Sequence, residues 1–491
     1  MRCRFLATLL CLGLPLLAAH AQNNYPLTPD SEKQAGVPQG RMESSKFTST
    51  KWFPGTMRDM RIYVPAQYDP KKPACVLVMQ DGGGYRIETV LDNLIAKGEV
   101  PVTIGIFLTP GVVPPKSDKA LPRYNRSYEY DSPTDTYVKF LLDEVLPEVS
   151  KKYNLSTNPN DRAIAGGSSG GIAAFTAGFF RPDAFRRVIS FIGSYTDLRG
   201  ATNYGALVRK FEPKPIRVFM QDGKNDQDIY SGSWPIGNTD LEAGLKFARY
   251  DYQMVWGEGH HDGVQGTAIL PDALRFIWKG WPAPIELPKE TPQPVMNWIV
   301  PGQGWQKASD NPFAPLPKGK RDVMGPYSTD DKGRVWLQPT KGKAKVVANF
   351  DDASGITLTP DQSLLMVSSR TGRYVRSYQV QTDGTLDFAQ DYHEVYTPWG
   401  QTKSLAGGMA CDTDGWLYLA SAFAVQVLDQ AGRVNGMLVN PPGGATVSVR
   451  FGGEGRKMLY ALCADGSVWV RPMRATGADP LQPNKPPQPR L

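Results

Sequence analysis

A pair of serines framed by glycines is the feature of the sequence that points most directly to chemistry. Residues 164–171 read I-A-G-G-S-S-G-G and continue a short apolar segment that starts at residue 162. The pattern G-x-S-x-G at a strand-to-helix turn exposes a serine nucleophile, and bulk two residues to either side would clash. It fits twice, on Ser168 and on Ser169. The pattern predicts acyl transfer through a serine ester.

A serine nucleophile needs a general base, and few histidines are available. His260 and His261 lie in a glycine-rich turn, G-E-G-H-H-D-G, directly after an apolar segment. His393 lies in a polar stretch, D-Y-H-E, which predicts a solvated surface residue. Because the base follows the serine and the acid in chains with this motif, we expect it in the 260/261 pair.

The acid that orients the histidine is expected after a strand between the serine and the histidine. Residues 221–228, Q-D-G-K-N-D-Q-D, follow an apolar segment and offer Asp222, Asp226 and Asp228. A buried carboxylate there would fix the imidazole tautomer and stabilise its charged form. The spacing alone leaves the choice among the three open.

Two backbone N–H groups must face the oxyanion of such a reaction. One belongs to the residue after the nucleophile, and the other to a loop after an early strand of the sheet. Residues 80–85, Q-D-G-G-G-Y, follow the apolar segment 74–79, and their three glycines allow a close approach of the backbone. We expect this loop to complete an oxyanion hole.

The segments that must position these residues alternate in type from about residue 45 to residue 281. Residues 134–153 predict a helix with Leu141, Leu142, Val145 and Val149 on one face. The segments typical of strands are 61–64, 74–79, 102–107, 162–165, 188–192, 216–220 and 252–256. Such alternation predicts βαβ units, and therefore a mostly parallel sheet with helices on both faces.

The pattern changes after a proline-rich stretch, residues 282–317, which predicts a semi-rigid linker. Short β segments then follow turn signals such as Asp414-Gly415 and Asp465-Gly466, which lie 51 residues apart, within the period expected of propeller blades. We therefore predict an all-β, propeller-like domain over residues 318–474. The proline-rich residues 475–491 predict a disordered tail.

The N-terminus has the pattern of a cleaved secretory signal. Arg2 and Arg4 precede the apolar residues 5–17, and residues 19–21, A-H-A, supply the small side chains that a signal peptidase needs. We predict a signal peptide over residues 1–21, then an N-terminal segment over 22–44, and a secreted or periplasmic protein. The apolar run is too short to span a bilayer, so no membrane span is expected.

The composition is that of a globular protein. Hydrophobic residues make up 41% and charged residues 21% of the 491 residues, which is enough to bury a sizeable core. The net charge of +7 comes without basic runs interleaved with aromatics, so nucleic acid is not an expected partner. After the predicted signal the chain has three cysteines, Cys75, Cys411 and Cys463, whose spacing matches neither a disulfide framework nor a metal site. A single Cys411–Cys463 bridge remains open.

With these motifs in order, residues 45–281 resemble the esterases related to enterochelin esterase and to the carbohydrate esterases that remove feruloyl or acetyl groups from xylan. The resemblance rests on I-A-G-G-S-S-G-G at 164–171, G-K-N-D at 223–226, G-H-H-D at 259–262 and R-S-Y-E at 126–129. It implies an α/β-hydrolase fold and a serine esterase.

The resemblance also implies roles for single residues. Ser168 becomes the nucleophile, because it is the serine followed by x-Gly-Gly. Asp226 becomes the orienting acid and His261 the general base. The backbone N–H groups of Ser169 and Gly83 become the donors of the oxyanion hole.

Residues 318–474 are similar to gluconolactonase/regucalcin-like propellers, on the motifs M-G-P at 324–326, S-G-I-T-L-T-P-D at 354–361 and G-G-M-A-C-D at 407–412. Those propellers hold a divalent metal at the positions of Met324, Ser354 and Gly407. Two of these side chains supply no oxygen ligand, which a hard cation needs. The resemblance therefore implies a degenerate propeller that packs or binds, without a metal or lactonase chemistry.

Together, the sequence predicts an exported serine carboxylic ester hydrolase that needs no cofactor. The resemblance favours feruloyl or acetyl esters of plant polysaccharide or oligosaccharide as substrates. Tyr230 and Trp234, after the acid loop, and Trp256, before His261, are candidates for an aromatic pocket that takes a phenolic acyl group. The alternatives are a non-catalytic carbohydrate- or surface-binding protein, a lactonase and a siderophore esterase.

Overall fold

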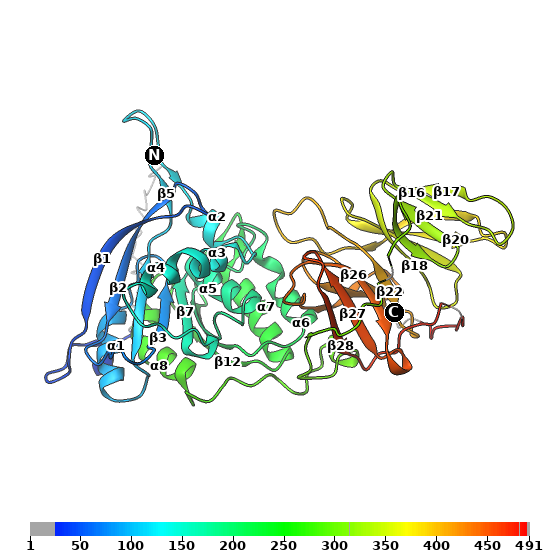
Figure 1. The fold of residues 1–491 in the computed structure, drawn as a ribbon. Helices are drawn as coiled ribbons and strands as arrows, with labels where there is room; N and C mark the ends of the chain where they lie inside the picture. Colours follow the sequence, from blue (N-terminus) through cyan, green and yellow to red (C-terminus); the bar gives the residue numbers. More distant parts are fainter. Residues whose placement is uncertain (1–24, 314, 481, 489–491) are drawn as a thin grey trace, which may run out of the picture.

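The structure of the protein, a computed structural model, describes residues 25–313, 315–480 and 482–488. The predicted signal peptide lies outside the described residues. The chain forms two parts, one built on a large sheet with helices and the other mainly of strands, and the two lie side by side (Figure 1).

A ten-stranded sheet organises the first part, with the order β12-β9-β8-β7-β3-β4-β2-β5-β6 and with β1 paired to β2. The six strands from β12 to β4 run parallel, whereas β2, β1, β5 and β6 pair antiparallel at one edge. The strands are β1 (Arg41–Thr48), β2 (Met57–Val64), β3 (Cys75–Met79), β4 (Thr103–Leu108), β5 (Val112–Val113), β6 (Arg123–Tyr124), β7 (Arg162–Gly167), β8 (Arg187–Phe191), β9 (Arg217–Gly223) and β12 (Asp251–Gly257). The predicted mostly parallel sheet is confirmed.

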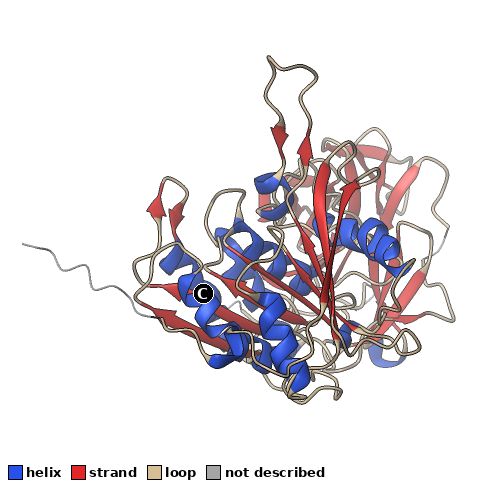
Figure 2. Cartoon of the chain, turned by 90° about the vertical axis from the view of Figure 1, so that its left-hand side faces the viewer, coloured by secondary structure: helices blue, strands red, loops and turns tan. Residues whose placement is uncertain are grey.

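Helices cover both faces of this sheet (Figure 2). The helices are α1 (Ile87–Ala96), α2 (Arg126–Tyr130), α3 (Thr136–Phe140), α4 (Leu146–Ser150), α5 (Ser169–Phe180), α6 (Tyr204–Lys210), α7 (Trp234–Phe247) and α8 (Val264–Trp278). The predicted helix over 134–153 corresponds to α3 and α4, which a π-helical turn at Leu141–Val145 joins. The β5–β6 hairpin projects away from this body (Figures 1 and 2).

Side chains of the central strand β3 divide between two cores, because successive residues of a strand point to opposite faces. Val76 and Val78 belong to the core on the side of α3 to α6, and Cys75, Leu77 and Met79 to the core on the side of α1 and α8. A strand buried on both faces reads as a continuous apolar run, which is how β3 appears in the sequence.

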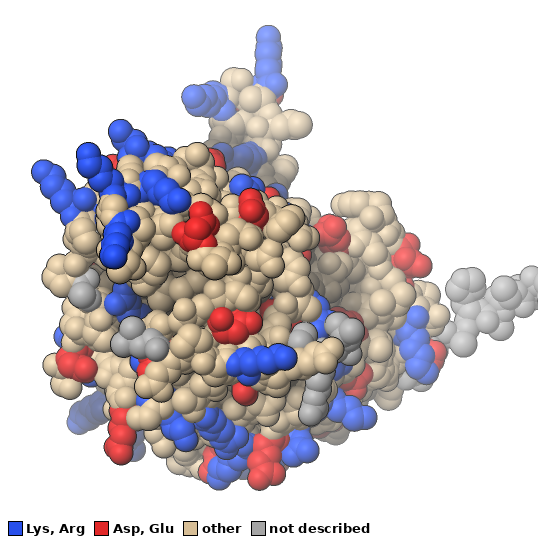
Figure 3. All heavy atoms as spheres, turned by 90° about the vertical axis from the view of Figure 1, so that its right-hand side faces the viewer, with Lys and Arg blue, Asp and Glu red and all other residues tan. Residues whose placement is uncertain are grey.

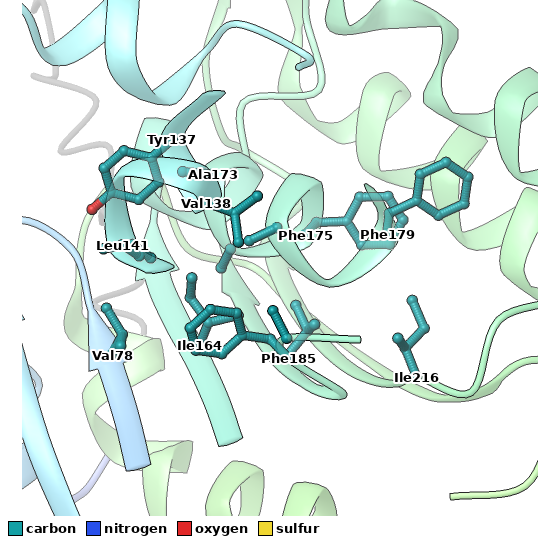
Figure 4. Packing of buried hydrophobic residues seen from close by; sticks show 14 of the residues in the cluster. Val78, Tyr137, Val138, Leu141, Ile164, Ala173, Phe175, Phe179, Phe185 and Ile216 are labelled. Atoms are coloured by element: carbon teal, nitrogen blue, oxygen red, sulfur yellow. The ribbon is translucent and has the colours of Figure 1, made fainter. Parts of the chain in front are cut away.

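Aromatic residues of α5 fill much of the first core. Phe175 and Phe179 pack over the strands near Ile164 (Figure 4). Their ring centroids lie 5.6 Å apart, and Phe179 also contacts Phe211, beyond α6, at 5.5 Å. This packing fixes α5, whose first residue follows Ser168, against the sheet.

The second part consists of four antiparallel four-stranded sheets in a propeller-like ring. The strands are β13 (Gln306–Lys307), β14 (Lys320–Met324), β15 (Tyr327–Asp330), β16 (Arg334–Leu337), β17 (Lys345–Asn349), β18 (Ala353–Leu358), β19 (Leu364–Ser369), β20 (Tyr374–Val380), β21 (Leu386–Glu394), β22 (Met409–Cys411), β23 (Leu417–Leu419), β24 (Val425–Leu428), β25 (Val434–Leu438), β26 (Thr446–Gly452), β27 (Met458–Cys463) and β28 (Val468–Pro472). Neighbouring sheets contact one another mainly through the strands β14, β18, β22 and β26. Seen from this end of the molecule, the surface carries charges of both signs, and Lys and Arg gather at one corner (Figure 3).

Two segments differ from the sequence prediction. Part of the predicted linker belongs to the propeller, since β13 pairs with β28 and completes the fourth sheet. The described part of the predicted tail runs along the propeller rather than away from it. Gly477 pairs with Asp412, and the Asn484 N–H donates to the Pro360 carbonyl at 3.0 Å. The proline content predicted that these two segments contain no helix or long strand. It did not predict that they pack against the propeller.

The two parts share a continuous core. Met437 of β25 and Ala424 of the propeller belong to the same buried cluster as α5 and α6. Phe423 packs its ring 5.4 Å from that of Phe211. At the margin of this contact, Arg471 and Glu212 form an ion pair at 3.1 Å, with side-chain exposures of 2% and 16%. The propeller therefore packs against the first part through a buried apolar contact with an ion pair at its margin.

Removing one partner of this ion pair should weaken that contact. Arg471→Met leaves the mostly buried Glu212 carboxylate without its cation, so we expect the free energy of unfolding to fall by about 2–4 kcal/mol. The double variant Arg471→Met/Glu212→Gln should lose less, because no charge is stranded. Denaturant unfolding of both variants measures this.

The matched control is Lys289→Met, which removes the exposed Lys289–Glu286 pair, whose side chains are 81% and 74% exposed. It should change stability by less than about 1 kcal/mol. An Arg471→Met variant as stable as Lys289→Met would show that the interfacial pair does not stabilise the protein.

Candidate active site

Ser168 occupies a sharp turn between β7 and α5. Its backbone lies at φ +57° and ψ −124°, a conformation that residues other than glycine rarely adopt. A Cβ on Gly166 would lie 2.3 Å from the Gly170 carbonyl oxygen, so the turn closes only with glycine at that position. Ser169, by contrast, is the first residue of α5. Of the two registers that the sequence allows, the strained turn therefore centres on Ser168.

A chain of hydrogen bonds joins Ser168, His261 and Asp226. The Ser168 Oγ lies 2.8 Å from His261 Nε2, and His261 Nδ1 lies 2.7 Å from Asp226 Oδ1. The Asp226 carboxyl is buried, with a side-chain exposure of 0%, and the imidazole is 18% exposed. This arrangement allows His261 to take the hydroxyl proton of Ser168 while Asp226 orients the ring.

The loops after β9 and β12 bring the acid and the base together. These two strands are parallel neighbours, so their carboxyl ends meet at one edge of the sheet. The loops nearly touch, because a Cβ on Gly223 would lie 2.1 Å from the Gly259 carbonyl oxygen. The Asn225 side-chain amide donates to the Glu258 carbonyl at 2.8 Å. Close packing of the loops thus sets the distance between Asp226 and His261.

The structure separates the candidates that the sequence left open. His260 is exposed, and its Nδ1 lies 3.0 Å from the Asn225 carbonyl, away from Ser168. Asp228 lies exposed in β10 (Asp228–Ile229), whereas Asp222 is fully buried behind Asp226. Of these candidates, only Asp226 bonds to a histidine that reaches Ser168.

Opposing influences act on the Asp226 carboxyl. Burial alone would raise its pKa, but hydrogen bonds from the side chains of His261 and Asp222 and from the Gln227 N–H outweigh burial and lower it. The Gln227 N–H donates to Asp226 Oδ1 at 2.5 Å. Asp226 is therefore a stable anion at neutral pH, as an orienting acid must be.

A cavity of about 350 Å³ opens above Ser168. Its wall comes from the β3–α1 loop, α2, the elbow, and the loops after β8 and β12. The lining residues are Gln80, Asp81, Gly83, Tyr85, Arg126, Gly167, Ser168, Ile192, His261, Asp262 and Gly263. The Ser168 hydroxyl thus faces a space large enough for a compact acyl group.

Of the two predicted oxyanion donors, Gly83 lines this cavity, and Ser169 directly follows the lining residue Ser168 in the chain. The Ser169 N–H begins α5 and has no acceptor among the residues that the structure describes. Gly83 has φ +92° and lines the cavity, and its N–H donates to the Gln80 carbonyl at 3.2 Å. Among the described residues, the Ser169 N–H thus has no hydrogen-bond acceptor, whereas the Gly83 N–H takes part in a long turn bond.

Arg126, the first residue of the motif at 126–129, forms a charged wall of the cavity together with Asp81. The Arg126 guanidinium donates to both Asp81 carboxylate oxygens, at 2.8 and 2.9 Å, and to Ser169 Oγ at 2.9 Å. Its pKa is raised, first by the hydrogen bond to Asp81. Glu129, from the same short motif, instead pairs with Arg58 inside the protein. The motif thus marked one residue of the cavity and one of the core.

The predicted aromatic pocket is not found at this cavity. Tyr230 lies 91% exposed in the turn after β10, and Trp256 donates its Nε1–H to Glu242 on α7 at 2.9 Å. Trp234 is buried and packs edge-on against the His261 ring at 5.4 Å, where it supports the imidazole rather than the substrate. The apolar wall comes instead from Tyr85 and Ile192. The three aromatic residues lie close to Asp226 or His261 in sequence, but this does not determine the direction in which their side chains point.

The propeller positions that resemble a metal site do not fit a metal. A Cβ on Gly407 would lie 2.1 Å from the Val447 carbonyl oxygen, so no ligand side chain has room there. The Ser354 hydroxyl donates to the Ala406 carbonyl at 2.6 Å. Among the described residues, no group of three His, Cys, Asp or Glu is arranged to hold a metal ion.

Three further residues of the propeller part decide points that the sequence left open. His393 is 2% exposed, and burial lowers its pKa to about 4, so the prediction of a solvated histidine is wrong. Its polar sequence neighbours lie on the exposed side of β21, which hid the buried face. Cys411 and Cys463 are both free and buried, so the structure contains no bridge between them.

The fold and this site define an α/β-hydrolase with a serine, a histidine and an aspartate in hydrogen-bond contact. Residues 53–263 match the model of a family described as putative esterase. This match supports a carboxylic ester hydrolase. In the described part of the chain, no helix has both the length and the apolar character needed to cross a membrane.

Similar proteins cover about half of the chain. The iron(III) enterobactin esterase of Dickeya dadantii (strain 3937) is 23% identical over 295 residues, which are 55% of this chain and 63% of that protein. The uncharacterized protein YjcH of Bacillus subtilis (strain 168) is 23% identical over 245 residues, 48% of this chain and 97% of that protein. The chain thus spans less than two thirds of the length of the enterobactin esterase.

Solved structures of esterases also match this half. A family 1 carbohydrate esterase, a ferulic acid esterase from Anaeromyces mucronatus, is 17% identical with a TM-score of 0.39, covering 52% of this chain and 98% of that one. The enterobactin esterase of Shigella flexneri is 20% identical with a TM-score of 0.39, covering 52% and 63%.

The two serines of the elbow should respond differently to substitution. Ser168→Ala removes the hydroxyl that contacts His261, so we expect no covalent labelling by a fluorophosphonate probe. Ser169→Ala removes only the hydroxyl that Arg126 contacts and keeps the backbone N–H, so labelling should largely persist. Mass spectrometry of the labelled protein identifies the modified residue. Labelling of Ser168→Ala at Ser169 would place the nucleophile one residue later.

Proposed function

We propose that the protein is a serine carboxylic ester hydrolase in which Ser168, His261 and Asp226 act as a catalytic triad. The observation that supports this most strongly is the unbroken hydrogen-bond chain from the Ser168 hydroxyl through the imidazole to a buried carboxylate. The strained backbone of Ser168 adds support, since it holds the hydroxyl at the floor of the cavity.

The reaction proceeds in two acyl-transfer steps. The Ser168 Oγ attacks the ester carbonyl while its proton passes to His261 Nε2, and the carbonyl electrons move onto oxygen. When the tetrahedral intermediate collapses, the ester bond breaks, and His261 gives the proton to the departing alcohol. Water then attacks the acyl-enzyme with His261 as the base again, and the acid leaves as Ser168 recovers its proton.

The Ser169 N–H is the primary oxyanion donor in this proposal. It lies at the N-terminus of α5, where the aligned peptide dipoles favour negative charge. The Gly83 N–H is the second donor. Its 3.2 Å bond to the Gln80 carbonyl is weak enough to be exchanged for a bond to a developing oxyanion. Asp81 and Arg126 neutralise each other and so do not repel that charge.

We propose a compact acyl ester as the substrate. The cavity of about 350 Å³ presents Tyr85 and Ile192 as apolar surface, which suits a feruloyl or acetyl group. Together with the predicted export signal, this favours esters of plant polysaccharide or oligosaccharide outside the cytoplasm. A catecholate siderophore ester is the second candidate, favoured by the similarity to a protein named as an enterobactin esterase.

Loss of the Asp226 charge should reduce turnover without preventing binding. Asp226→Asn keeps the size of the side chain but removes the anion that stabilises the imidazolium, so kcat should fall by about 10³–10⁴-fold with little change in KM. Hydrolysis of p-nitrophenyl acetate measures both constants. Asp228→Asn, an exposed substitution in the same loop, is the matched control and should keep wild-type rates. Equal activity of the two variants would remove Asp226 from the triad.

The choice among substrates is decided by direct comparison. With purified protein, we expect turnover of methyl ferulate and acetylated xylan, with kcat/KM at least tenfold above that for a catecholate siderophore ester. The reverse order would favour the siderophore reading. Absence of turnover with all three and with p-nitrophenyl acetate, together with absence of fluorophosphonate labelling, would contradict the esterase proposal itself.

A further inference from the structure

A second carboxyl group lies directly behind the proposed triad. Asp222 is the penultimate residue of β9 and is 0% exposed. The Asp226 N–H donates to the Gly223 carbonyl at 3.1 Å, so the chain turns back on itself. This turn brings the side chain of Asp226 into hydrogen-bond contact with that of Asp222. The two carboxyl groups share one buried pocket.

One oxygen atom of each carboxyl group has no hydrogen-bond donor, which indicates where a proton lies. Asp222 Oδ1 accepts from the Gly223 N–H at 2.8 Å, and Asp226 Oδ1 accepts from His261 and from the Gln227 N–H. The Oδ2 atoms of Asp222 and Asp226 are both buried, and neither accepts a hydrogen bond from an N–H or O–H group of the other described residues. A buried oxygen without a donor is costly. A single proton between the carboxyl groups satisfies both oxygen atoms.

Among the residues that the structure describes, no Lys or Arg forms an ion pair with Asp222 or Asp226. The titratable groups that act on Asp222 or respond to it are Asp226, His261 and Tyr195, whose hydroxyl is bonded to Ser190. The elements packed against the end of β9 present neutral groups. The acid nearby on α7, Glu242, accepts a hydrogen bond from Trp256, the residue of β12 that pairs with Asp222. The neutral groups are Asn238 and Trp234 of α7, Gln265 of α8 and Trp256 of β12.

Physical chemistry then places the proton. Two carboxylates in contact within a buried site cannot both be ionised, because each penalises the charge of the other. Asp226 accepts hydrogen bonds from the imidazole and from a backbone N–H, whereas Asp222 has the Gly223 N–H and the uncharged side chain of Asn238. Burial, and next the contact with Asp226, raise the pKa of Asp222 to about 9. The proton therefore belongs to Asp222 at neutral pH.

We propose that Asp222 is a protonated positioning residue, whose carboxylic acid donates a hydrogen bond from Oδ2 to Oδ2 of Asp226. It acts through Asp226 and does not touch the substrate. The bond holds the Asp226 carboxylate with Oδ1 toward His261 and makes the carboxylate a weaker base, so that the proton taken from Ser168 stays on the imidazole. The catalytic consequence of this inference rests on the proposed triad. The presence of a proton on Asp222 does not depend on the triad.

Two substitutions distinguish the hydrogen bond that Asp222 donates from the space that its side chain fills. Asp222→Asn keeps the size and supplies an amide N–H to Asp226, so kcat for p-nitrophenyl acetate should stay within about threefold of wild type. Asp222→Leu fills similar space without a donor, and kcat should fall at least tenfold with KM nearly unchanged. Asp228→Asn is the control and should match wild type. An Asp222→Asn variant as impaired as Asp222→Leu would overturn the donor role.

The pH profile gives a readout that a merely structural role would not change. Above its pKa of about 9, Asp222 loses its proton and places a second charge beside Asp226. We expect the wild-type and Asp228→Asn profiles of kcat to show an alkaline transition in this range. The Asp222→Asn profile should lack it. The same transition in Asp222→Asn would assign it to another group and contradict the proposal.

Thermal unfolding tests the proton without any use of activity. A carboxyl whose pKa is raised in the folded state holds its proton there, but loses it on unfolding above about pH 4. Stability from this group is therefore lost as pH rises from about 4 to about 9. We expect the Tm of Asp222→Asn to rise relative to wild type by several degrees between pH 5 and pH 8.

The control fixes the interpretation of that shift. Asp228→Asn, at an exposed position, should show a Tm difference from wild type that does not depend on pH. A difference for Asp222→Asn that is equally flat would mean that Asp222 is ionised in the folded protein, and it would overturn the inference. If the Tm shift is found and no esterase activity is, the proposed function fails while the protonated Asp222 stands.

Discussion

The strained backbone of Ser168 is the constraint on which the rest of the site depends. A φ of +57° at a serine persists only where the surrounding packing fixes it, and here that packing is backbone against backbone. Gly166 and Gly170 meet at a distance that excludes a Cβ, and the Ser168 N–H is bonded to the Phe191 carbonyl of β8 at 2.9 Å. The buried aromatic side chains of α5 then hold the helix that begins one residue later. The core thereby positions the serine hydroxyl and the Ser169 N–H together.

Those parts of the site that depend on backbone geometry were predictable from the sequence. Glycines flank Ser168 because no other residue fits, and the order of serine, acid and histidine follows from the order of the strands. The direction of side chains in the loops and at the strand ends beside them was not predicted. Tyr230 and Trp256 lie near the acid and the base in sequence, but a turn exposes the first and strand alternation turns the second toward α7. Arg126 reaches Ser169 from a short helix more than forty residues away, a contact that only the closed fold creates.

The same distinction explains the propeller. Turn signals and short apolar runs predicted its strands, because hairpins are local. The closure of the fourth sheet by β13 depends on a strand of two residues in a proline-rich stretch, too short to leave a pattern. Contact with the hydrolase part depends on residues such as Met437 and Phe423, whose apolar character fits an internal core as well as an interface. Composition alone does not distinguish these two uses.

Most charges around the Ser168–His261–Asp226 chain are neutralised by a partner or by a proton. Arg126 and Asp81 cancel at one wall of the cavity, and a proton on Asp222 leaves one negative charge beneath His261. That charge is the one that a transient imidazolium requires. No described residue that lines the cavity adds an unpaired cation, so in the proposed mechanism the oxyanion is stabilised by backbone N–H groups and by the N-terminus of α5. The elbow itself fixes these dipoles, so the strain at Ser168 and the proposed stabilisation of the transition state have the same structural origin.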